Sequence, residues 1–282
     1  MTRLAEIEGH IASMDELSDI VGAMRSLAGM RVQEAQRGLP GIRRYAQSMA
    51  AAIGAALLLM PQPGPESRAR GRRALVLCAP EHGFVGGFNE RLIEAAEAAL
   101  AAEELLFVLG SRGAALALER GRTVFWTRPM ATRLAGAPDT VDHLVVELYA
   151  HIARGEISRV EVMFGRYRQG DIPAIERRLL LPLDAGELGP ARPSQSPLHT
   201  LEPRVLFEEL VAEYVFARLT EAAVESIASE NAARFAAMES AHDNVAKKLE
   251  ELRQDARQAR QSEITAELLD LITGAEAIGS RS

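Results

Sequence analysis

The stretch that decides the fold is 204–278, which reads RVLFEELVAEYVFARLTEAAVESIASENAARFAAMESAHDNVAKKLEELRQDARQARQSEITAELLDLITGAEAI. It contains no proline, and its only glycine is Gly274. One unbroken helix over this stretch would be on the order of 110 Å long, whereas the mean helix of a globular protein has about 11 to 12 residues. A rod of this length cannot bury its apolar residues against itself, so the stretch predicts a long helix that needs a partner.

Apolar residues in the second half of this helix alternate in steps of four and three, with one step of five. This spacing is typical of a coiled-coil seam with one shift in phase. The seam residues are Val245, Leu249, Leu252, Ala256, Ala259, Ile264, Leu268, Leu271, Ala275 and Ile278.

A matching apolar pattern lies at the other end of the chain, in residues 3–38. Its members recur at helical spacing: Leu4, Ile7, Ile11, Met14, Leu17, Val21, Met24 and Ala28. The two helices flank the rest of the chain, so we expect residues 1–60 and 204–282 to form one discontinuous domain, a long antiparallel coiled coil. Gly38, Pro40 and Gly41 predict a bend or a short break in the first helix, which then resumes.

The middle of the chain, residues 74–183, has a different pattern, in which short apolar runs alternate with amphipathic segments. The runs predict strands at 74–78, 105–109, 123–126, 159–167 and 174–181, and the segments between them predict helices at 87–102, 114–120 and 140–154. Strand and helix in alternation predict a small parallel sheet and a three-layer, Rossmann-like α/β domain. Residues 184–203 are rich in proline and glycine and predict a linker.

Composition and charge exclude several classes of function. The net charge is -7, and residues 204–282 hold nine basic against fifteen acidic residues, which argues against a nucleic-acid partner. The single cysteine, Cys78, lies in an apolar run and is most simply a small buried hydrophobe in a reducing compartment. No apolar span reaches eighteen residues, and Glu6 and Glu8 stand where a signal peptide would avoid acids, so we expect a soluble, unprocessed chain.

The loop after the first predicted strand is the one candidate for a nucleotide site. It contains Gly83, Gly86 and Gly87, but the spacing is G-x-x-G-G, whereas a dinucleotide site needs G-x-G-x-x-G. We therefore interpret the three glycines as a structural turn with close helix packing, and expect no cofactor. The six histidines have no metal-ligand spacing, and no nucleophile motif occurs, so we expect neither a metal site nor a catalytic residue.

Two runs on the long helix resemble the carboxy-terminal signatures of the gamma subunit of rotary F-type ATP synthases. Residues 228–238, ASENAARFAAM, resemble A-S-E-x-A-A-R-x-x-A-M, and residues 260–268, RQSEITAEL, resemble R-Q-A-x-I-T-x-E-L with Ser262 in place of alanine. Residues 20–31, IVGAMRSLAGMR, and 81–89, EHGFVGGFN, resemble the family's I-T-K-A-M-K-M-V-A-A-x-K and D-R-G-L-C-G-G-L-N. The resemblance spans the whole chain.

Three positions depart from the family pattern. Asp19, Gly22 and His82 stand where the family usually has lysine, lysine and arginine. These departures suggest a divergent, alternative branch of bacterial gamma subunits.

The resemblance implies a central rotor shaft with no catalytic site of its own, a subunit of a proton- or sodium-translocating ATP synthase. In the family the coiled coil rises through a ring of alpha and beta subunits, which hold the nucleotide sites, and the α/β domain contributes to a foot on the membrane-embedded c-ring. The implied partners are the alpha, beta and epsilon subunits and the c-ring. The implied location is peripheral, on the cytoplasmic face of the bacterial plasma membrane. Residues that the resemblance assigns to contacts with the alpha/beta ring are Met24, Arg25, Glu230, Arg234, Arg260, Gln261, Thr265 and Glu267.

Two other functions fit the residues alone. One is a structural coiled-coil scaffold unrelated to rotation, and the other is a nucleotide-binding enzyme that uses the loop from Gly83 to Gly87.

Overall fold

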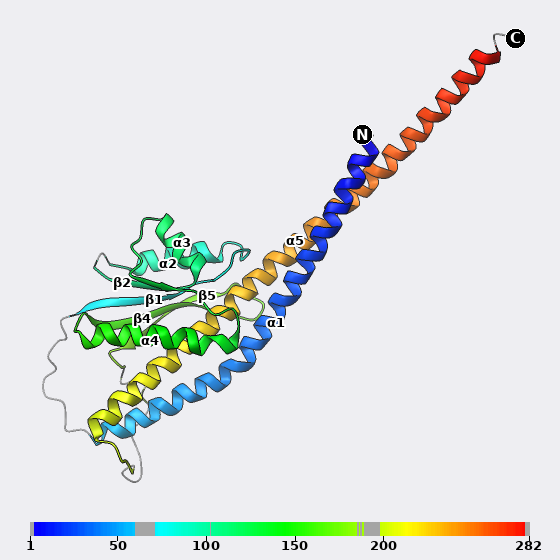
Figure 1. Ribbon diagram of the computed structural model, residues 1–282. Coiled ribbons are helices and arrows are strands. Elements are labelled where there is room, and N and C mark those ends of the chain that lie inside the picture. Colours follow the sequence, from blue (N-terminus) through cyan, green and yellow to red (C-terminus); the bar gives the residue numbers. More distant parts are fainter. Residues whose placement is uncertain are drawn as a thin grey trace. The chain divides into compact units, whose positions relative to one another are not determined.

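The computed structural model describes residues 3–59, 71–101, 103–184, 186, 188 and 198–279, with the backbone alone at 270 and 273–279. The chain begins and ends with a very long helix, and a sheet and three shorter helices come between these two helices in the sequence (Figure 1). The elements are α1 (Arg3–Leu57), β1 (Arg72–Cys78), α2 (Phe88–Ala99), β2 (Leu105–Leu109), α3 (Ser111–Glu119), β3 (Trp126–Arg128), the 3-10 turn η1 (Leu134–Gly136), α4 (Ala137–Ala153), β4 (Ile157–Arg166), β5 (Ala174–Leu181) and α5 (Pro203–Gly279).

The chain divides into two compact units, which we describe separately. The larger unit comprises residues 28–235, and the smaller comprises residues 1–27 with 236–282. The predicted α/β domain, 74–183, lies inside the larger unit together with adjoining parts of both long helices. The boundaries of the predicted domains stay a prediction, and most of the predicted linker, 184–203, lies outside the described residues.

The larger unit is built on a five-stranded sheet in the order β3-β2-β1-β4-β5. β1 pairs in parallel with β2 and β4, and β2 pairs in parallel with β3. β5 runs antiparallel to β4, because a short connection rather than a crossover helix joins them. The sheet is therefore mixed, whereas the sequence predicted a parallel one.

Helices cover both faces of this sheet, which confirms the predicted three-layer α/β architecture. Alternate residues of β1 face opposite ways: Leu75 and Leu77 pack with α2 and α3, whereas Val76 and Cys78 pack with α4. The layer on the α4 side also contains the first part of α5, whose buried residues in this core run from Val215 to Ala228. The long helix is thus part of the α/β core, which the sequence did not indicate.

The sequence predicted a bend or a short break in α1, and the structure shows no break. The helix is continuous from Arg3 to Leu57, with Pro40 in its interior. Leu39 is 2% exposed and packs in the core, so tertiary packing holds the helix together across the proline. Gly38 serves close packing here, because an added Cβ would lie 2.5 Å from Cδ2 of Leu134.

In the smaller unit, α1 and α5 pair in antiparallel fashion, as predicted. Arg253 pairs with Asp15 at 3.2 Å and Arg260 with Glu8 at 2.7 Å, so numbers rise along one helix as they fall along the other. The first seam residues are buried, at Val245, Leu249 and Leu252. The seam prediction fails farther along, where α1 no longer lies opposite α5. Exposed there are Ile264, Leu268 and Leu271, while the side chains of Ala275 and Ile278 lie outside the described residues.

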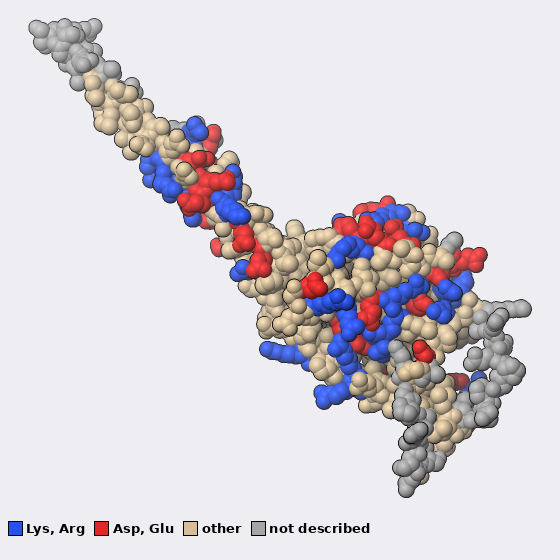
Figure 2. Space-filling view, turned by 180° about the vertical axis from the view of Figure 1, so that it is seen from behind, with Lys and Arg blue, Asp and Glu red and all other residues tan. Residues whose placement is uncertain are grey.

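The surface charges are mixed. Figure 2 shows basic and acidic side chains intermingled on the face that it presents. Several are paired, as in Arg166 with Glu176 at 2.8 Å and Arg154 with Glu156 at 2.9 Å. On this face the described residues form no broad patch of one sign.

Cys78 is fully buried in β1, and burial raises the pKa of its thiol to about 12. This agrees with its interpretation as a small hydrophobe. In the part of the chain that the structure describes, no helix is long and apolar enough to cross a membrane, and no three His, Cys, Asp or Glu residues are grouped to hold a metal ion.

Candidate functional site

Two of the motif stretches meet at the carboxyl edge of the sheet. Residues 81–89 follow β1, and residues 228–238 belong to α5. In an open α/β sheet the carboxyl ends of the parallel strands share one edge, and ligands usually bind there, where the order of strands reverses. That reversal lies between β1 and β4 in this sheet. The position deserves comparison with a ligand site for this reason alone.

Side chains of α5 occupy this position. The Ser226 hydroxyl donates a hydrogen bond of 2.6 Å to the carbonyl oxygen of Cys78, the last residue of β1. Gly165 in β4 permits the close approach, because an added Cβ would lie 2.9 Å from Cβ of Ser229 and 2.5 Å from Cζ of Phe88. The long helix therefore fills the space in which a doubly wound domain would hold its ligand.

A buried ion pair on α5 binds the loop after β1. Arg234 and Glu230 are 2.7 Å apart, and their side chains are only 11% and 7% exposed. The Arg234 guanidinium also donates to the carbonyl oxygen of Gly83 at 3.2 Å and to Oδ1 of Asn231 at 3.0 Å. Glu230 Oε2 accepts from the main-chain N–H of Glu81 at 3.2 Å. Both charges are thus paired and hydrogen-bonded, as burial requires.

The Glu81 side chain extends the same network into the sheet unit. Its Oε2 accepts from the N–H of Ser111 at 2.9 Å and from the N–H of Met130 at 2.8 Å. Ser111 is the first residue of α3, and its N-cap residue, Gly110, supplies no side-chain hydrogen bond. A carboxylate at this place satisfies a free helix N–H and interacts favourably with the helix dipole. We call Glu81, Gly83, Glu230 and Arg234 the edge junction.

The glycines of the loop fit the predicted turn but not the predicted close helix packing. Gly86 has a φ of +55°, which fits a tight turn. An added Cβ at Gly83 or Gly87 would meet nothing within 4 Å, so neither glycine serves close packing. Close packing is instead the role of Gly110 and Gly113. An added Cβ at Gly110 would lie 2.3 Å from the carbonyl oxygen of Ala79, and one at Gly113 would lie 2.1 Å from the Cβ of Ala79.

A family model described as ATP synthase matches residues 3–278 of the chain. The chain belongs to the gamma-subunit family of F-type ATP synthases. The recognition made from the four motif stretches is thereby confirmed.

Solved structures of rotors share the fold of this gamma-family chain. A chain in a cryo-EM structure of the Euglena gracilis mitochondrial ATP synthase, OSCP/F1/c-ring in rotational state 3, has a TM-score of 0.66 and 14% identity, over 98% of this chain and 94% of that one. A chain of the Euglena gracilis rotor in rotational state 1 has a TM-score of 0.60 and 12% identity, over 93% and 98%. A chain of the Tetrahymena thermophila central stalk and c-ring has a TM-score of 0.56 and 16% identity, over 79% and 99%.

The residues predicted to contact the alpha/beta ring fall into groups with different surroundings. Glu230 and Arg234 are buried in the edge junction of the larger unit. Met24 and Arg25 belong to the smaller unit, where both side chains on α1 are half-buried. The remaining four lie on α5 in the smaller unit and are exposed: Arg260, Gln261, Thr265 and Glu267.

Three of these four line one shallow groove of about 340 Å³ on α5: Arg260, Gln261 and Thr265, together with Ala256, Arg257 and Ile264. Arg260 also pairs with Glu8 at 2.7 Å, and the Thr265 hydroxyl donates to the carbonyl oxygen of Gln261 at 2.8 Å. The Gln261 and Glu267 side chains thus lie on an exposed helix surface. All eight ring contacts stay predictions.

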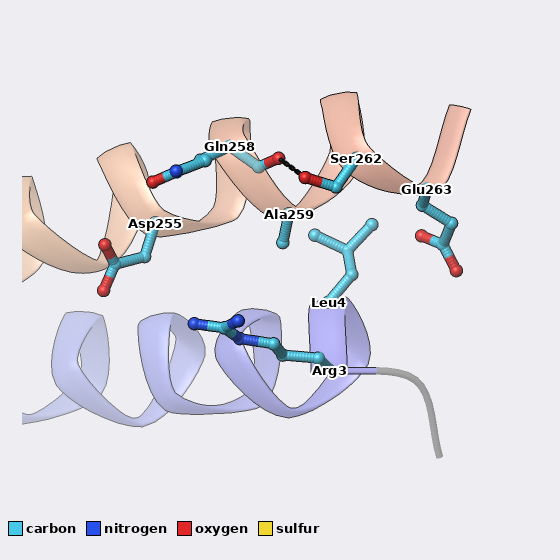
Figure 3. Close-up of a pocket in the computed structure, with 7 residues that line it drawn as sticks. All are labelled: Arg3, Leu4, Asp255, Gln258, Ala259, Ser262 and Glu263. Carbon is cyan, nitrogen blue, oxygen red and sulfur yellow. Dashed lines mark hydrogen bonds between the residues drawn. The ribbon is translucent and has the colours of Figure 1, made fainter. Parts of the chain in front are cut away.

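A second groove in the smaller unit lies between the beginning of α1 and α5, with a volume of about 270 Å³ (Figure 3). Leu4 points from α1 toward Ala259, so two predicted seam residues face each other. Ser262, which departs from the family pattern, donates to the carbonyl oxygen of Gln258 at 3.1 Å. This open groove is smaller than the usual ligand pocket of about 300 to 1,000 Å³.

A charged network in the larger unit was not predicted. Arg43 of α1 pairs with Glu221 at 3.0 Å and with Glu225, both buried on α5, and Arg178 of β5 pairs with Glu221 at 3.0 Å. Burial raises the pKa of Glu225, and the N–H of Tyr167 and the charge of Arg43 oppose this rise. The network joins α1, α5 and the sheet. Glu221 and Glu225 are four residues apart on a helix, but the sequence alone predicts only a solvated face for such a pair.

Proposed function

We propose that this gamma-family chain is the central rotor shaft of an F-type ATP synthase, coupling ion-driven rotation of the c-ring to ATP synthesis or hydrolysis in the alpha/beta ring. The observation that carries the proposal is the family match over residues 3–278. The architecture supports it, because the first part of α5 is a layer of the α/β core and the same helix continues unbroken to Gly279. A shaft needs such a fixed attachment at its base.

The chain contributes asymmetry to the complex. A shaft that presents different faces to three similar catalytic sites biases their conformational equilibria, provided that its contact free energy differs between their states. The exposed side chains of Arg260, Gln261, Thr265 and Glu267 are available for such contacts, and we propose the same role for Met24 and Arg25. Ring contacts by Glu230 and Arg234 would require these side chains to exchange their partners within the chain.

The partners and location follow from the family. We propose contacts with the alpha and beta subunits, the epsilon subunit and the c-ring, with attachment to the membrane only through the c-ring. The proposed location is the cytoplasmic face of a bacterial plasma membrane. The transported ion, proton or sodium, is selected in other subunits, and so is unaffected by the residues discussed above.

Copurification of the tagged chain from its own cells tests the proposal. We expect large alpha and beta subunits, three of each for every copy of this chain, with ATP hydrolysis in the purified complex. Recovery of the chain only as a homo-oligomer would favour a coiled-coil scaffold. Stoichiometric binding of ATP or NAD by the isolated chain would favour a nucleotide-binding enzyme, although α5 side chains occupy the expected ligand position.

A further inference from the structure

We propose that Glu81 is a positioning residue for rotation: its carboxylate is a built-in anion that holds the loop after β1 to α3 and to the segment after β3, its main-chain N–H binds α5, and torque passes between the α/β domain and the shaft through this connection. The inference rests on the proposed function and assigns a residue to it. Glu81 belongs to neither long helix and was not among the predicted contact residues. The signal in the sequence is its place directly after the first strand.

Glu81 joins segments that are far apart in the sequence. One carboxylate oxygen accepts N–H groups from Ser111 at the start of α3 and from Met130 after β3, and the main-chain N–H of the same residue donates to Glu230 on α5. Glu230 is 5% exposed and Met130 is 3% exposed. Water therefore has little access to the contacts with Glu230 and Met130, whereas Ser111 is exposed.

The carboxylate lies at a helix N-terminus, which favours an anion. Phosphate groups of nucleotides bind at such helix N-termini in other proteins. In this chain the helix N-terminus is that of α3, and the anion is the side chain of Glu81. The free energy by which a bound ligand stabilises a structure depends on its concentration, rising with the logarithm of that concentration over the dissociation constant. A carboxylate of the chain itself makes the connection permanent.

The connection reaches both long helices. On one side Glu81 binds Glu230, four residues before Arg234, and α5 continues as one helix to Gly279. On the other side it holds Met130, four residues before Leu134, which lies against Gly38 of α1. Loss of the carboxylate would free the loop after β1 and the segment after β3 together, while the buried strands stay paired.

The test uses the complete ATP synthase reconstituted into vesicles with the Glu81→Ala chain. Two rates are compared: ATP hydrolysis, and ATP-driven uptake of protons or sodium ions. We expect ion uptake per ATP hydrolysed to fall, and acetate to restore it, because acetate can occupy the vacated position. Amide hydrogen exchange at Ser111 and Met130 should be faster by about 10-fold or more, since each loses a hydrogen bond to a charged group.

Two further variants make the result specific. Glu119→Ala removes an exposed carboxylate from the other end of α3 and should leave all rates unchanged. Glu81→Gln keeps an oxygen that can accept both N–H groups but lacks the charge. It should fold, show a smaller loss of coupling, and not respond to acetate, because its amide fills the site.

An unchanged ratio of ions to ATP in both Glu81 variants would overturn the proposal. So would an equal loss of uptake, hydrolysis and assembly that acetate does not restore, because Glu81 would then serve folding alone. The wild-type complex distinguishes a failure of the role of Glu81 from a failure of the proposed function. If the wild-type chain does not support coupled uptake, the proposed function fails, whereas equal coupling by wild type and variants defeats only the role of Glu81.

Discussion

Replacement of Arg234 by methionine tests the energetics of the edge junction. Methionine keeps much of the apolar stem and removes the guanidinium, which donates to Glu230 at 2.7 Å, to Asn231 at 3.0 Å and to Gly83 at 3.2 Å. The Glu230 carboxylate stays buried, and the main-chain N–H of Glu81 still donates to it. Breaking a buried ion pair from one side costs about 3 to 5 kcal/mol, and we expect the free energy of unfolding to fall by this amount.

Urea denaturation of the full chain measures this change. Trp126 is the single tryptophan and lies in β3 of the larger unit, so its fluorescence reports the unfolding of that unit. Arg204→Met is the matched control, because Arg204 pairs with Glu208 at the same spacing on the same helix, but with side chains 75% and 62% exposed. Its loss should cost only about 0 to 0.5 kcal/mol.

A double variant identifies the cause of the loss. If the cost of Arg234→Met comes from an unpaired carboxylate, adding Glu230→Gln should recover more than about half of it, since replacing both partners is far less costly than replacing one. A cost below about 1 kcal/mol for the single variant, or no recovery in the double variant, would refute the buried-pair reasoning.

Three other predictions follow from the same structure. Gly113→Ala should lower the free energy of unfolding by about 1 to 3 kcal/mol, because the new Cβ would lie 2.1 Å from the Cβ of Ala79. Gly83→Ala is the control: an added Cβ there meets nothing within 4 Å, so the free energy of unfolding should change by less than about 0.5 kcal/mol. Urea denaturation of the two variants and the wild type measures both changes. Burial raises the pKa of Glu225, so the folded state binds its proton more tightly than the unfolded state, and stability from this group is full at low pH and lost as pH rises through the folded pKa. Glu225→Gln should therefore gain stability relative to wild type as the pH rises above the ordinary pKa of a glutamate, about 4 to 5, and a difference that does not change with pH would contradict this. Replacement of both Arg260 and Gln261 by alanine should lower the ATPase rate or the assembly of the reconstituted complex while the helicity of the free chain, measured by circular dichroism, stays the same; unchanged rate and assembly would make them an ordinary solvated surface.

The sequence predicted those parts of the fold in which a local pattern coincides with the final packing. The strand from 105 to 109 agrees with β2, and the absence of proline after 203 agrees with α5. Pro40 misled the prediction, because the burial of Leu39 outweighs a missing hydrogen bond. The distal seam misled it too, because apolar spacing at Ile264 and beyond says nothing about whether a second helix lies opposite.

The candidate site was predictable only in part. The motif resemblance identified Glu230 and Arg234, which are four residues apart and therefore on one side of a helix. Their common partner, the loop at Glu81 and Gly83, is about 150 positions away in the sequence, and no local pattern announces such a pairing. The role of Gly113 is equally hidden, since its cause is a side chain on another element.

The proline inside α1 also makes the two long helices mechanically unequal. Pro40 has no N–H, so the main-chain hydrogen bond that would end at the carbonyl of Gln36 is missing, and a helix bends most easily at such a place. α5 has no proline after its first residue, and its glycines stand only at 274 and 279. Elastic deformation of the shaft should therefore concentrate in α1 near Pro40, while α5 bends evenly: one helix is the compliant member of the pair and the other is the stiff one.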